Sequence, residues 1–153
     1  MGVERILVAV DLRGATTEVV KAALALASPL GAEIVLFTVV SVAAGVNPFA
    51  EAADGRTNEQ VLDADAFGDL EPFVALIERE GVSVTRDIGH GEPSLGIASA
   101  IERHRPDLVV VGTHARTGLA RLLLGSVAEA VLRSSPVPVL VVRSPATGLD
   151  PGE

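Results

Sequence analysis

The 153-residue sequence contains no cysteine, no tryptophan and no tyrosine, and it has a single lysine, Lys21. Without cysteine, neither a disulfide framework nor a thiolate-ligated metal site is possible. No apolar run reaches the roughly 18 residues that a membrane-spanning helix needs, so we expect no membrane partner. The GxxxxGK[ST] loop of the common nucleotide hydrolases is also absent, and no phosphate-binding lysine can be assigned.

The charge is strongly acidic, with a formal net value of −8. Because the basic residues do not cluster, we expect no nucleic-acid partner. Residues 51–80 hold nine acidic side chains, which we interpret as a solvated helix face and loop. The three histidines, His90, His104 and His114, lack metal-ligand spacing, so no metal site is predicted. The start of the chain has no signal-peptide pattern, which predicts a cytoplasmic protein.

Short runs that are apolar at nearly every position alternate with amphipathic helical patterns. Strands of this kind are buried on both faces, which indicates a parallel sheet covered by helices. One strand instead alternates apolar and polar residues and is expected at a sheet edge. The sequence thus predicts a single α/β domain over residues 1–144 and a disordered tail over 145–153. Strands are expected at 6–10, 34–40, 82–88, 108–111 and 139–142, and helices at 16–30, 58–80, 93–103 and 127–135.

Four local features refine these expectations. Pro72 lies inside the second helix and predicts a break or kink near Asp69. Residues 41–57 form a long loop that is either mobile or flanks a site. A turn is expected over residues 89–94. Ser126, three residues before a glutamate, predicts a capping box at the start of the last helix.

Candidate ligand contacts follow the strand ends. In open parallel sheets, ligands bind beyond the carboxyl ends of the strands where the strand order reverses. Asp11 and Gly112 directly follow two of the predicted strands, and Val39 lies near the end of a third. The Asp11 carboxylate can accept hydrogen bonds from ribose hydroxyls, or it can cap the turn into the first helix.

A second glycine, Gly125, directly precedes the last helix. The first-turn N–H groups and the dipole of that helix are available to an anion. Arg116 and Arg121 either neutralise phosphate charge or are ordinary solvated surface residues. No Ser/His/Asp arrangement is evident, and no catalytic residue is assigned.

The segment Gly112-Thr113-His114-Ala115, followed by nine residues and then Gly125-Ser126, resembles the nucleotide-binding signature of the universal stress protein family. That signature is glycine, two residues, glycine, nine residues, glycine, and serine or threonine. The resemblance extends over about residues 4 to 143. It implies an open five-stranded parallel sheet of order 3-2-1-4-5 with helices on both faces, similar to the adenine nucleotide alpha hydrolases.

The resemblance also implies a ligand and its contacts. ATP, with or without Mg²⁺, is the expected cofactor. Asp11 would hold the ribose and the Val39 backbone would meet the adenine. The residues implied around the ribose and phosphates are Gly112, Ala115, Arg116, Gly125, Ser126 and Val127. Ala115 replaces the second glycine of the signature, and its methyl group would crowd the phosphates.

Three functional hypotheses follow from these patterns. The first is an ATP-binding stress-response regulator, with ATP as a bound ligand that is hydrolysed slowly or not at all, and with a regulatory protein partner that the sequence does not identify. The alternative is a dimeric interaction module that Ala115 prevents from binding nucleotide. A small hydrolase or synthetase using the same cradle is a third reading.

The last predicted strand bears on assembly. Family members usually form dimers through it, and here it consists of Val139, Leu140, Val141 and Val142. A bare apolar edge strand is an aggregation hazard unless it is paired. We therefore expect a homodimer through this strand.

Overall fold

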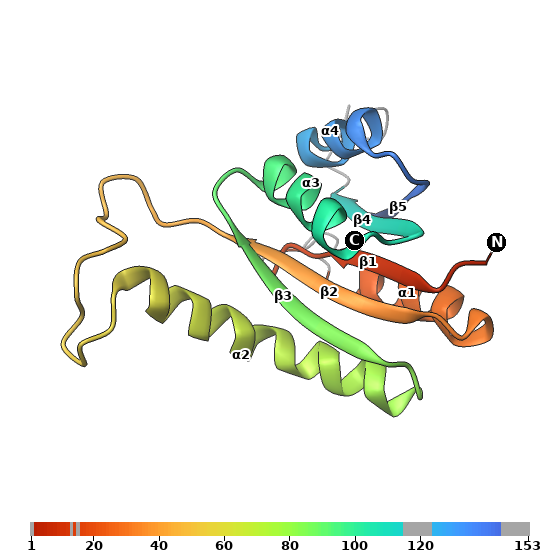
Figure 1. Ribbon diagram of the computed structural model, residues 1–153, viewed down its shortest axis with the longest axis horizontal. Coiled ribbons are helices and arrows are strands. Elements are labelled where there is room, and N and C mark those ends of the chain that lie inside the picture. The colour runs from red at the N-terminus through yellow and green to blue at the C-terminus, as the bar shows by residue number, and fades with distance from the viewer. Residues whose placement is uncertain (1, 13, 15, 115–123, 145–153) are drawn as a thin grey trace, which may run out of the picture.

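The computed structural model describes residues 2–12, 14, 16–114 and 124–144. Strands and helices alternate, and the five strands form one parallel sheet of order β3-β2-β1-β4-β5 (Figure 1). This confirms the predicted fold class and strand order. The elements are β1 (Arg5–Ala9), α1 (Thr16–Leu30), β2 (Glu33–Val40), α2 (Asn58–Arg79), β3 (Val84–His90), α3 (Pro93–His104), β4 (Leu108–His114), α4 (Ser126–Ser134) and β5 (Val139–Ser144).

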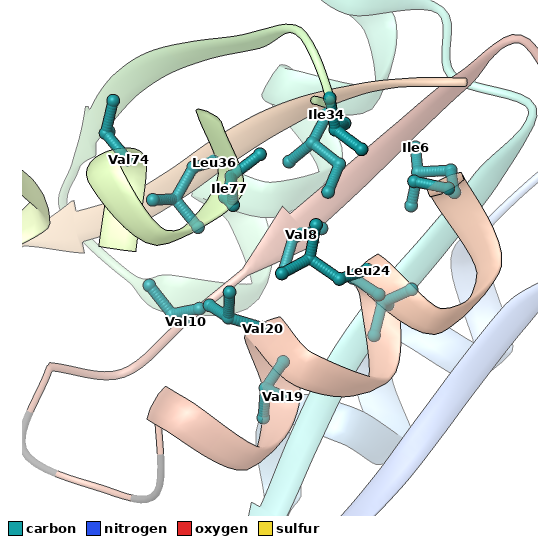
Figure 2. Close-up of a cluster of buried hydrophobic side chains, with 14 of the residues drawn as sticks. Ile6, Val8, Val10, Val19, Val20, Leu24, Ile34, Leu36, Val74 and Ile77 are labelled. Carbon is teal, nitrogen blue, oxygen red and sulfur yellow. The ribbon is translucent and has the colours of Figure 1, made fainter. Parts of the chain in front are cut away.

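Two apolar clusters lie on opposite faces of the sheet, because successive strand side chains point to opposite sides. In β1, Ile6 and Val8 pack with α1 and α2, whereas Leu7 packs with α3 and α4. Figure 2 shows the first cluster, in which α1 and α2 side chains cover the strands. Each fully buried aliphatic side chain contributes about 1.5–3 kcal/mol, so helices on both faces hold the strand ends in place.

Of the predicted break or kink near Asp69, the break is wrong, because helix α2 runs without interruption through Pro72. Pro72 lacks the N–H that would bond the Gly68 carbonyl. Both of these residues are exposed, so water can reach that carbonyl. The opposite face of the helix is anchored in the core, and this packing outweighs the local proline penalty. The buried residues of α2 are Ala66, Leu70, Val74 and Ile77.

Strands β3 and β4 end later in the chain than predicted. Strand β3 continues through Gly89 and His90, where a turn was expected, because both residues pair with β2. A Cβ on Gly89 would lie 2.7 Å from the Phe37 ring, so this glycine permits close packing of the sheet. Strand β4 continues past Gly112 to His114 and pairs with β5. Polar side chains at the strand ends hid both extensions.

The loop over residues 41–57 folds back onto the start of α2. The backbone N–H of Asn58 donates to the Ala50 carbonyl at 2.9 Å, and that of Glu59 donates to the Pro48 carbonyl at 3.0 Å. The capping box lies here: Thr57 accepts from the Gln60 N–H and donates its own N–H to the Gln60 side chain. The loop and the first turn of α2 are therefore joined. None of the described helices is long and apolar enough to cross a membrane.

Candidate functional site

A pocket of about 680 Å³ lies at the carboxyl ends of β1, β2 and β4. Strand β1 is the switch point of the sheet, with β2 on one side and β4 on the other, and such points form ligand crevices. The size is typical of small-molecule sites. Ala115 and Arg116 lie outside the described residues. The other six predicted residues line the pocket: Asp11, Val39, Gly112, Gly125, Ser126 and Val127.

The exposed backbone of Val39 results from the divergence of β1 and β2. The Val10 N–H donates to the Phe37 carbonyl at 2.8 Å, and the Thr38 hydroxyl donates to the Val10 carbonyl at 2.9 Å. Beyond Val10 the chain turns away from the sheet. Because the backbone groups of alternate strand residues face the same side, those of Val39 face the β1 side, as those of Phe37 do. The N–H and C=O of Val39 therefore point into the pocket.

Asp11 occupies the turn between β1 and α1. Its carbonyl oxygen accepts hydrogen bonds from the Gly14 N–H and the Thr16 hydroxyl, both at 2.9 Å. Thr16 is buried and is the first residue of α1. These bonds hold residue 11 at the rim of the pocket, where its side chain is exposed.

The N-terminus of α4 forms another wall of the pocket. Gly125, not Ser126, is the N-cap, so the predicted capping box of Ser126 and Glu129 is wrong. The helix begins one residue earlier than that box requires, and the Glu129 carboxylate instead accepts from Arg133 at 3.3 Å. The Gly125 N–H donates to the Thr113 hydroxyl at 2.9 Å.

The next three residues after Gly125 supply the first-turn N–H groups, which have no partner within a helix. All three of them line the pocket: Ser126, Val127 and Ala128. Together with the helix dipole, these donors form a site suited to an anion.

Gly112 has a packing role that the sequence did not reveal. A Cβ at this position would lie 2.6 Å from Cγ2 of Val19 on α1, which is closer than real carbon contacts allow. The glycine therefore lets α1 approach β4, in addition to lining the pocket. The spacing of residues in the sequence could not reveal this packing role, because the contact joins residues far apart in the chain.

The charge of the pocket is unevenly distributed. Three carboxylates line it, Asp11, Asp65 and Asp69, and among the described lining residues there is no lysine or arginine. Sequence reasoning assigned the α2 acids to a solvated face and so missed Asp65 and Asp69. The described residues contain no group of three or more acidic or histidine side chains placed to hold a metal ion.

The fold and the pocket together define a class: an open, doubly wound α/β domain with a pocket at the switch point of its sheet, the place where such folds bind small ligands. Comparison with known proteins places the chain within that class. The universal stress protein family matches residues 2–143, and the chain belongs to this family.

Individual relatives agree with this assignment. Universal stress protein MJ0531 of Methanocaldococcus jannaschii is 33% identical over 142 residues, which are 93% of this chain and 83% of the relative. The solved structure of MJ0577, from the same organism, has a TM-score of 0.74 at 27% identity and covers 94% of this chain and 98% of its own. A universal stress protein from Archaeoglobus fulgidus, solved in complex with dAMP, shares the fold with a TM-score of 0.62 at 23% identity, over 93% of this chain and 99% of its own.

Proposed function

We propose that this chain binds ATP in the pocket and acts as a stress-response regulator, with ATP as a bound ligand that is hydrolysed slowly or not at all. One observation carries the proposal: the open backbone edge of Val39 and the N-terminus of α4 line the same pocket. The backbone edge of Val39 suits a nucleotide base, and the N-terminus of α4 suits phosphates. The dAMP complex of the Archaeoglobus fulgidus protein supports an adenine nucleotide as the ligand class. The cytoplasmic location and the protein partner stay predictions.

The hydrogen-bonding pattern of Val39 matches adenine. One N–H donor and one C=O acceptor lie side by side on the strand edge. Adenine presents an acceptor at N1 beside a donor amine at N6, which is the complementary pair. Asp11, at the adjacent strand end, is placed to accept hydrogen bonds from the ribose hydroxyls.

The phosphates would lie against α4. The N–H groups of Ser126, Val127 and Ala128 are the donors there, and the helix dipole favours negative charge. Because the described lining contributes carboxylates and no cationic side chain, Mg²⁺ carried by the phosphates would offset the repulsion.

Calorimetry with Mg-ATP tests the proposal on the intact chain. We expect saturable binding and a matching rise in thermal stability, because a ligand at about 100 times its Kd adds about 2.7 kcal/mol. Inorganic triphosphate serves as the control that lacks the base and ribose. If about 1 mM ATP gives neither heat nor a thermal shift, the nucleotide-free interaction module is the better description.

We also propose a homodimer through β5, which is an edge strand of the sheet. Val139 and Val141 pack against the α3/α4 cluster and Val142 against the other cluster. Leu140 is 36% exposed, so a substitution at this position of the strand should disturb the core least.

Leu140→Lys should convert the dimer to monomer without unfolding it, because a charge on a paired edge opposes association. Light scattering at micromolar concentration measures the mass. Leu30→Lys is the matched control, since Leu30 is 52% exposed at the end of α1. A wild-type protein that is monomeric at high concentration contradicts the proposal.

A further inference from the structure

One face of α2 forms a wall of the pocket. Leu62, Asp65, Ala66 and Asp69 line it, and their spacing of three, four and seven residues places them on a single helix face. The apolar pair, Leu62 and Ala66, offers apolar contact to a planar ring. The acidic pair adds two exposed carboxylates beside that surface.

Two neighbouring acidic residues of α2 form bonds to side chains outside the pocket. Asp63 bonds to His90 at 2.7 Å, and Glu71 forms an ion pair with Arg86. Both of these partners are on β3, so these bonds fix the helix to the edge of the sheet. Asp65 and Asp69 form no side-chain hydrogen bond or ion pair with the residues that the structure describes, and they are the two that line the pocket.

We propose that Asp65 and Asp69 determine base specificity by accepting a hydrogen bond from the exocyclic amine of adenine. This inference rests on the proposed function. The N6 amine carries two hydrogens, and the Val39 carbonyl can accept only the one on its own side. The second hydrogen needs another acceptor, and an ionised carboxylate is acceptor-only.

The same carboxylates reject a base with an oxygen at that position. Hypoxanthine differs from adenine by a carbonyl in place of the amine and by a proton on N1. Its O6 would face carboxylate oxygens, and neither group can donate. A site built around a hydrogen bond discriminates strongly against an analogue that cannot form it.

The charge distribution also orients the ligand. The α2 wall is negative, whereas the α4 N-terminus carries the positive end of a helix dipole. A polyphosphate placed against Asp65 and Asp69 would be repelled by both carboxylates. The phosphates are therefore directed toward α4, which leaves the base beside α2.

The test compares ATP with ITP in the full chain by calorimetry. In the wild type, ATP should bind at least about 10-fold to 100-fold more tightly than ITP, because ITP loses the hydrogen bond to the carboxylates and also mismatches the donor and acceptor of Val39. In Asp65→Asn/Asp69→Asn the ratio should fall to about one-tenth of the wild-type ratio or lower, because an asparagine amide can donate to O6. A general charge effect on the phosphates changes both affinities equally and cancels in the ratio.

The matched control is Glu59→Gln/Glu78→Gln, which removes two charges from the same helix at positions outside the pocket lining. It should keep the wild-type ratio. An unchanged ratio in the aspartate variant, with folding verified by circular dichroism, overturns the inference, as does a wild type that binds both nucleotides equally. Failure of the wild type to bind ATP at all is the separate failure of the proposed function, and the inference falls with it.

Discussion

Replacing Ser126 with proline should weaken ATP binding about 10-fold to 100-fold while leaving the fold intact. Proline lacks the backbone N–H but is favoured at the first position of a helix, which Ser126 occupies in α4. The preceding residue must be extended, and Gly125 already is, with φ −65° and ψ 156°. The loss corresponds to one hydrogen bond to a charged group, about 1.5–3 kcal/mol. Calorimetry with Mg-ATP gives the affinity.

Ser126→Ala is the control for this experiment. It removes the hydroxyl and retains the N–H, so its affinity should stay much closer to that of the wild type. Thermal unfolding of both variants reports whether α4 is intact. If proline and alanine at position 126 bind ATP equally well, the first-turn N–H groups of α4 do not hold the phosphates.

Gly112→Ala should destabilise the protein by about 1–3 kcal/mol, the usual range for overpacking a core. The added Cβ would lie 2.6 Å from Cγ2 of Val19, so either α1 or β4 must shift. Urea denaturation followed by circular dichroism measures the change.

Val19→Ala tests the cause. It removes the methyl groups that the new Cβ meets, so Gly112→Ala should cost much less in the Val19→Ala background than in the wild type. Residues in direct contact show coupling energies of about 0.5–3 kcal/mol in such cycles. Strictly additive effects would show that Gly112 is required for another reason.

Sequence reasoning succeeded for the central strands and for two residues of the pocket. The apolar runs over 6–10, 34–40 and 108–111 identified the central strands, because a strand buried on both faces has few polar positions. Asp11 and Val39 followed from the rule that ligands meet the carboxyl ends of parallel strands, and both line the pocket. The strand order came from the resemblance to the family, and the structure confirms it.

The remaining features depend on contacts between distant segments. The pattern around Asp65 and Asp69 is the same for a solvated helix face and for a pocket wall, and only the docking of α2 distinguishes them. The sequence shows that Pro72 disfavours a continuous helix. It does not show the tertiary packing that outweighs this penalty. The capping box failed by one residue, because the helix begins at Ser126 rather than after it.

The pairing of β1 with β4 has a consequence for synthesis on the ribosome. Ile6 lies beside Leu108 in the sheet, so β1 leaves the ribosome long before its neighbour β4 has been synthesised. The donors of α4 emerge later still. Under the proposed function, nucleotide cannot guide the folding of the nascent amino-terminal half, and its stabilisation is gained only once translation has passed α4.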